Sequence, residues 1–334
     1  MFSFSEIMYK NLIIIITILI LPWITLSAFA VHITETNMQE MRKYTEDEVS
    51  ELRKRAEAGE REAQTELSIC YGQGNGITQN YKEAFKWAMR AAERGNSKAE
   101  MIVGMCYLTG KGTTIDTEEA TKWLIQAAEH GNISACLKLG MLYLTGYEGT
   151  AKKPAEAIKW LRKAADQNNA EAQVMLGIMY EYGEEGVAQN IEDAKEMYMK
   201  SAAQGNAQAS CMLGKYILQH QNEPWYTEKG KLAVNMIEHA AYKNDNTARE
   251  LLGSMYYWGA MGKKEDRTEA SKWFENGSSF SKFLLAMMYW NGDGVKQDRS
   301  KALELMSEAA KESPLAQRIL DNMIISYCYS SNEK

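Results

Sequence analysis

Few residues in this chain are suited to metal binding or redox chemistry. Its 334 residues include 5 cysteines and 4 histidines, and no Cys-x-x-Cys motif or histidine pair has the spacing of a metal site. No nucleophile stands in a recognisable arrangement with a base, and no Gly-x-Gly turn leads into the Gly-Lys-Ser/Thr of a phosphate-binding loop. The sequence therefore predicts neither an enzyme nor a cofactor or metal site.

Proline and runs of positive charge are also scarce. Only 4 prolines occur, so long segments rich in alanine, methionine, lysine and glutamate are free to form helices. The formal net charge is −6 and no long basic run is present, so nucleic acid is not an expected partner. With 45% apolar and 25% charged residues, the composition is that of a globular protein.

The longest apolar stretch lies near the N-terminus. Lys10 precedes the stretch 12–21, and Pro22 and the small-residue motif Ala28-Phe29-Ala30 follow it. A basic start, an apolar stretch and an A-x-A motif describe a secretory signal peptide, so we expect cleavage after Ala30 and a periplasmic protein. The alternative is an uncleaved anchor in the inner membrane, with the rest of the chain facing the periplasm.

A turn residue recurs every 36 to 39 residues through most of the chain. Twelve positions after each turn comes a tyrosine or its substitute, and three positions before that tyrosine stands a small residue. The turn residues are Gly59, Gly95, Gly131, Asn168, Gly205, Asn244 and Gly277, and the tyrosine positions are Tyr71, Tyr107, Tyr143, Tyr180, Ile217, Tyr256 and Tyr289. Self-similarity at this period indicates a solenoid, in which each repeat buries its apolar face against its neighbours.

Each repeat is predicted to consist of two antiparallel helices, A and B. Helix A carries the small residue and the tyrosine, and a glycine-rich turn such as Gly110-Lys111-Gly112 follows it. Helix B carries an alanine and, three residues later, a large apolar residue. The B-helix alanines are Ala84, Ala120, Ala157, Ala194, Ala233, Ala270 and Ala302. The small residues let the two helices approach closely, and the large ones fill the space beside them.

The fold class expected from this pattern is an all-α, right-handed α-solenoid of seven repeats with an N-terminal capping helix. We place a signal peptide at 1–30, a linker at 31–45, the capping half-repeat at 46–59, the repeats at 60–325 and a tail at 326–334. Thr45 with Glu48 three residues later predicts a capping box at the start of the first helix.

The repeats resemble a known family. The segment Asn291-Gly-Asp-Gly-Val-Lys-Gln-Asp298, with Ala302 after it, is similar to the Sel1-like repeat, a relative of the tetratricopeptide repeat. The resemblance covers about residues 48–325. It implies an exported protein-interaction solenoid, a periplasmic adaptor or regulator that binds a partner protein on its concave face.

Two other functions are suggested by the same resemblance. Some exported Sel1-like proteins are immunity proteins that neutralise a toxic effector in the periplasm, and this stays open as an alternative. Others are described as β-lactamase-like hydrolases, but those carry paired cysteines in every repeat, which this chain lacks. Here Cys70 and Cys106 occupy equivalent positions on helices that should lie about 8–10 Å apart. A disulfide needs Cα atoms within about 7 Å, so we expect no bridge between them.

A second stripe of the A helices is left over once the packing positions are assigned. It lies six and two residues before each tyrosine position and one residue after it, and we call it the A-helix stripe. Its candidate partner-binding residues, with close neighbours, are Met101, Met105, Met141, Tyr257, Trp258, Phe280, Phe283, Met287 and Trp290. Aromatic and methionine side chains beyond what packing needs indicate a binding surface, although apolar stripes are more often core.

The fifth and sixth repeats break the pattern. In the fifth, residues 219–226 replace the glycine turn and bring in Trp225 and Tyr226, which we add to the candidate binding residues. In the sixth, Trp273 stands only four residues before Gly277, so helix B should be one turn short. We expect any specific site to lie within residues 219–291.

Overall fold

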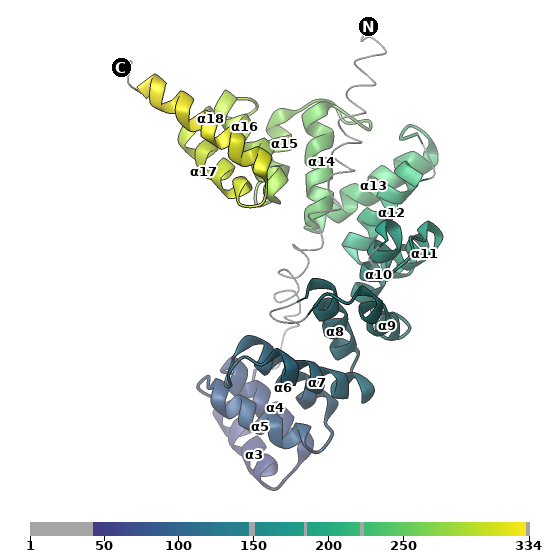
Figure 1. Cartoon of the computed structure of the whole chain (residues 1–334), viewed down its shortest axis with the longest axis vertical. Coiled ribbons are helices and arrows are strands. Elements are labelled where there is room, and N and C mark those ends of the chain that lie inside the picture. The colour runs from purple at the N-terminus through teal and green to yellow at the C-terminus, as the bar shows by residue number, and fades with distance from the viewer. Residues whose placement is uncertain (1–42, 147–150, 184–185, 221–223, 332–334) are drawn as a thin grey trace. The chain divides into compact units, whose positions relative to one another are not determined.

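The computed structural model describes residues 43–146, 151–183, 186–220 and 224–331. These residues form sixteen helices and no β-strand (Figure 1). The helices are α3 (Glu46–Glu57), α4 (Arg61–Gln73), α5 (Tyr81–Ala92), α6 (Ser97–Thr109), α7 (Thr117–Glu129), α8 (Ile133–Thr145), α9 (Pro154–Ala165), α10 (Ala170–Tyr182), α11 (Ile191–Ala203), α12 (Ala207–His220), α13 (Glu228–Tyr242), α14 (Asn246–Trp258), α15 (Arg267–Phe274), α16 (Ser279–Asn291), α17 (Arg299–Ala310) and α18 (Pro314–Ser331). The predicted signal peptide and most of the linker lie outside the described residues.

The helices follow one another as seven A–B pairs, from α4–α5 to α16–α17, with α3 before them and α18 after them. Helices pack on their neighbours in chain order, as between α4 and α5, α5 and α6, and α6 and α7. This arrangement confirms the predicted all-α solenoid. No helix in the described part of the chain is long and apolar enough to cross a membrane.

The described residues fall into two compact units. The N-terminal unit comprises residues 43–197 and the C-terminal unit residues 198–331, with the boundary inside α11. Each unit has its own core. In the C-terminal unit, successive clusters form around Leu252 and around Met288, both of which are almost fully buried.

Helix starts follow from local sequence. The predicted capping box is present: Thr45 Oγ1 accepts from the amide of Glu48, and the Glu48 carboxylate accepts from the amide of Thr45. Asparagine and aspartate side chains cap most later helices in the same way, as Asn96 does for α6 and Asp116 for α7. These caps satisfy amides that the first helical turn leaves without partners.

The small residue of helix A marks the point where helices A and B come closest. A Cβ added at Gly104 would lie 2.8 Å from Leu124 Cγ, and one added at Gly140 would lie 2.5 Å from Leu161 Cγ. Ser68 takes the same place in the first repeat and donates a hydrogen bond to the carbonyl of Ala84. The recurring small residue is therefore required by helix packing.

The irregular repeats have the predicted consequences. Helix α15 has only 8 residues, whereas the other B helices have between 12 and 15, which confirms the missing turn. Its last residue, Phe274, is fully buried and packs against Gly253 of α14. In the fifth repeat, α13 has 15 residues and begins directly after a rebuilt loop.

Candidate partner-binding surface

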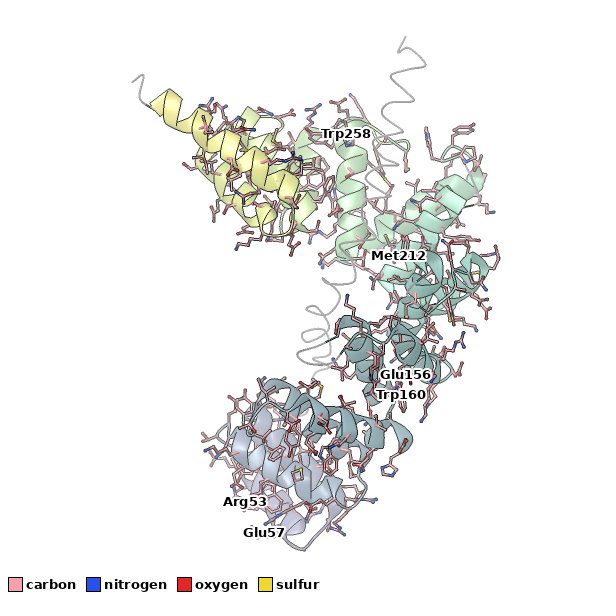
Figure 2. All side chains as sticks on the ribbon, in the orientation of Figure 1. Arg53, Glu57, Glu156, Trp160, Met212 and Trp258 are labelled. Carbon is pink, nitrogen blue, oxygen red and sulfur yellow. The ribbon has the colours of Figure 1, made fainter. Side chains whose placement is uncertain are left out.

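Six of the predicted binding residues lie on α14 and α16 of the C-terminal unit. All six are half-buried, and Trp258 lies at the C-terminal end of α14 (Figure 2). The six residues, which we call the aromatic cluster, are Tyr257, Trp258, Phe280, Phe283, Met287 and Trp290.

Two pairs of rings within the aromatic cluster are in contact. Tyr257 and Trp258 meet edge to face with centroids 4.7 Å apart, and Phe280 stacks on Phe283 at 6.4 Å. Phe283 packs against two successive core clusters, so it links the α14–α16 layer to the α16–α17 layer. Part of each ring therefore stabilises the fold, and the remaining surface is available for contact.

Two arginines lie over the cluster. The guanidinium of Arg267 is 4.7 Å from the centroid of Tyr257, and that of Arg299 is 5.2 Å from the centroid of Trp290. Arg267 also pairs with Asp293. Burial raises the pKa of Tyr257, so its hydroxyl stays protonated at neutral pH. The two guanidinium groups therefore cover part of the rings, and the charge of Arg267 is balanced by Asp293 and Glu265.

The A-helix stripe of the N-terminal unit is more deeply packed. Met101, Met105 and Met141 are half-buried, whereas Leu137 and Val174 on the same stripe are buried. Most of the stripe on α8 and α10 therefore serves as core. Partner binding by the three methionines therefore stays a prediction from the sequence.

Trp225 and Tyr226 lie on a compact turn before α13. They are 41% and 63% exposed, and their rings meet edge to face at 5.9 Å. Thr227 Oγ1 donates to the carbonyl of Pro224 and accepts from the amide of Gly230. The indole of Trp225 rests on Gly262 of the following repeat. Both aromatic residues are thus held in place and remain accessible.

A set of buried polar residues on the same stripe was missed by sequence reasoning. Lys215, Glu250 and Ser254 are each at most 4% exposed. Glu250 Oε2 accepts from Ser278 and Ser281, whereas Glu250 Oε1 and Ser254 Oγ have no hydrogen-bond partner. Burial raises the pKa of Glu250, and nearby Lys215 partly opposes this. The signal was present in the sequence, because these polar residues occupy positions that are apolar in most repeats.

Another buried carboxylate joins two repeats of the N-terminal unit. Glu100 is 2% exposed, and both of its carboxylate oxygens lie 2.9 Å from His130 Nδ1. His130 caps the C-terminus of α7, where the helix dipole favours a cation, as its place in the sequence suggested. The structure adds its partner and so assigns His130 a structural role.

The cysteines and acidic residues form no reactive centre in the described residues. Cys70, Cys106 and Cys136 are not bridged, as expected for Cys70 and Cys106. Burial raises the pKa of Cys106 to about 11, so its thiol is protonated and unreactive at neutral pH. No group of three or more His, Cys, Asp or Glu side chains in this part of the chain could hold a metal ion.

Solved structures of similar sequence share this fold. A protective antigen present in uropathogenic Escherichia coli strains is 30% identical, with a TM-score of 0.70. The match covers 84% of this chain but only 61% of that protein's length. A Sel1 repeat protein from Oxalobacter formigenes is 28% identical over 83% of this chain and 80% of its own, with a TM-score of 0.63.

An immunity protein from Pseudomonas aeruginosa also matches, over 65% of this chain and 82% of its own length. It is 21% identical to this chain, with a TM-score of 0.38. None of the curated proteins matches.

The Sel1 repeat model matches residues 61–96, 97–132, 133–169, 170–206, 247–278 and 279–314. It passes over the fifth helix pair, α12–α13, which is the repeat with the rebuilt loop. Sel1 repeats form a protein-interaction fold, and proteins built from them are generally non-catalytic scaffolds. The chain belongs to the Sel1 repeat family.

Proposed function

We propose that this protein is an exported adaptor or regulator that binds a partner protein through the aromatic cluster of α14 and α16. The observation that carries the proposal is that six large apolar side chains on α14 and α16 of the C-terminal unit are all half-buried. Packing alone would bury such residues, and solvent exposure alone would select polar ones. Partly exposed aromatic side chains are typical anchors of protein interfaces.

The side chains around the cluster indicate what the partner offers. Arg267 and Arg299 lie over its rings, and Arg267 pairs with both Asp293 and Glu265. A partner segment with apolar anchors would complement the exposed parts of the rings. The more acidic helix edges elsewhere on the chain favour basic groups at the periphery of the same partner.

The test is removal of two anchors. The double variant Tyr257→Ala, Trp290→Ala is expected to reduce partner capture from periplasmic extract by about 30-fold or more. Truncation of an anchor residue costs about 2 kcal/mol of binding free energy, which corresponds to about 30-fold in affinity. Bound proteins are identified by mass spectrometry, and folding is followed by thermal melting in circular dichroism.

The matched control is Trp160→Ala. Trp160 is also half-buried beneath a cation, with Lys163 Nζ 5.4 Å from its ring, but it lies on a B helix of the N-terminal unit. The control should keep full capture. Unchanged capture by the double variant, with an unchanged melting curve, would contradict the proposal.

The cellular location is part of the same proposal. Residues 1–30 have the features of a signal peptide, and we infer that cleavage after Ala30 releases the protein into the periplasm. A partner met there is an envelope component or a protein entering the envelope.

A further inference from the structure

Helix α13 and the turn before it carry several exposed large apolar side chains. Leu232 is 56% exposed and Tyr242 is 69% exposed. With Trp225 and Tyr226 on the preceding turn, this one repeat presents four large apolar side chains to solvent. We call these four residues the α13 face.

Comparison between repeats shows that two of these positions are usually acidic. Leu232 stands just before the B-helix alanine, where five other repeats have Glu83, Glu119, Glu156, Asp193 and Glu269. Four of those carboxylates pair with a lysine three residues later, whereas Leu232 is followed at that distance by Asn235. Tyr242 stands where the first three repeats have Glu93, Glu129 and Asp166. The α13 face has thus lost negative charge and gained apolar surface at the same positions.

Positive charge remains around these side chains. Lys229 and Lys231 on α13 and Lys243 at its C-terminal cap are all exposed. The two carboxylates of the helix are each paired, Glu228 with Lys231 at 2.9 Å and Glu238 with Lys263. The local surface is therefore basic, although the whole chain has a net charge of −6.

The four side chains are distributed along α13 and the turn before it. Leu232 and Tyr242 lie about 80° apart around the helix axis and about 15 Å apart along it. Trp225 and Tyr226 stand before the N-terminal end of the same helix on a turn closed by Thr227. Because 80° is less than half of the helix circumference, Leu232 and Tyr242 can face the same flat partner.

We propose that the α13 face docks on an anionic lipid surface, with the helix lying parallel to the bilayer. Tryptophan and tyrosine prefer the boundary between lipid and water, leucine adds apolar burial, and the lysines are attracted to anionic headgroups. The side chains project from a helix and its preceding turn and are separated by polar residues, which suits a soft bilayer better than a protein partner with matching pockets. This second surface does not depend on the aromatic cluster.

The test uses the full chain and follows quenching of tryptophan fluorescence by brominated lipids. Vesicles are one part phosphatidylglycerol to three parts phosphatidylcholine, or phosphatidylcholine alone, with bromine on the acyl chains. The difference in quenching between the original protein and Trp225→Phe measures the contact that Trp225 makes with lipid. Residues 1–30 are present in both proteins, so their own contact with lipid cancels in this difference. We expect such quenching with anionic vesicles, and its marked reduction by high salt or by omission of phosphatidylglycerol.

Variants that restore the usual repeat residues test the remaining contacts. Leu232→Glu with Tyr242→Glu should reduce the Trp225-dependent quenching about tenfold, because the substitutions remove apolar burial and add repulsion. Ile115→Glu, at a residue that is 54% exposed in the N-terminal unit, is the matched control and should leave it unchanged. Melting in circular dichroism checks that the variants fold.

Three results would overturn the proposal. One is the absence of Trp225-dependent quenching at low salt, and another is equal quenching by both vesicle types. The third is that the Leu232→Glu, Tyr242→Glu variant loses a defined protein partner while its quenching by lipid is unchanged. That result would assign the α13 face to a protein. Loss of partner capture through Tyr257 and Trp290 is measured separately, so either proposal can fail alone.

Discussion

Glu250 is a buried carboxyl group with an incomplete set of hydrogen bonds. It is 1% exposed, and one of its carboxylate oxygens has no hydrogen-bond partner. A buried charge without full hydrogen bonding is costly, so burial raises the pKa of this carboxyl group. The protonated form fits the folded state better than the ionised form. Protein stability should therefore depend on pH through this residue.

The direction of this pH dependence follows from the raised pKa of Glu250 in the folded state. The protonated Glu250 carboxyl group favours the folded state, so its contribution to stability is fully present below the pKa of the unfolded state. That contribution is lost as the pH rises through the higher pKa of the folded state. Glu250→Gln, which stays neutral, should raise the free energy of unfolding by about 1 kcal/mol at pH 8 relative to the original protein. The difference should shrink toward pH 4. Urea unfolding of both proteins across this range measures it.

Glu265→Gln is the control, because Glu265 is exposed. It should leave the pH dependence in place. A Glu250→Gln variant that is less stable than the original protein at pH 8 would show that the ionised carboxylate is stabilising, through Lys215.

Helices A and B approach closely because a small residue stands at their contact, and in α6 and α8 that residue is a glycine. Gly104 and Gly140 lie directly against Leu124 and Leu161, which are both fully buried. The first glycine of α4, Gly72, differs because a Cβ added there would meet only Ala84 Cβ, at 3.8 Å. Glycines within helices therefore divide into those required by packing and those that only loosen the helix.

This difference gives a prediction with its own internal control. Gly140→Ala should lower the free energy of unfolding by about 1–3 kcal/mol, because the added methyl group forces Leu161 to move. Gly72→Ala should raise it by about 0.5–1 kcal/mol, since alanine favours helix and the space is open. Thermal melting of the two variants separates the effects. Equal shifts in both would argue against a packing requirement at the A–B contact.

At the scale of the whole molecule, stability is built from contacts between neighbours in the chain. Helices pack on those before and after them, and the described residues divide into two compact units. In such an architecture, insertions within a repeat often mark the binding face. Here the departures concentrate in the C-terminal unit, in the fifth and sixth repeats.

We predict that the chain is exported and that its signal peptide is removed. Protein recovered from the periplasm should begin at Val31, because the peptidase would cut after Ala30. Intact-mass measurement and N-terminal sequencing check this. Protein that keeps residues 1–30 and fractionates with the inner membrane would support the anchored alternative.

The repeat pattern predicted which residues face inward only to within one position. The sequence pointed to the large residue three places after the B-helix alanine, such as Trp160. In the structure Trp160 is half-buried, and the fully buried residue is the next one, Leu161. One position is about 100° of helix rotation, and the neighbouring helix decides which of the two side chains is covered. Periodicity alone cannot make that choice.

The sequence by itself determined the helical repeats, their order, the caps that begin them and the missing turn of α15, because these depend on contacts between residues close in the chain. Only the tertiary structure decided which leftover apolar residues are core, as for Leu137 and Val174, and which stay accessible, as for Tyr226 and Leu232. It alone also brought Lys215 near Glu250 and Glu100 beside His130. Burial and pairing depend on the distance between helices that are remote in sequence, and no local pattern encodes that distance.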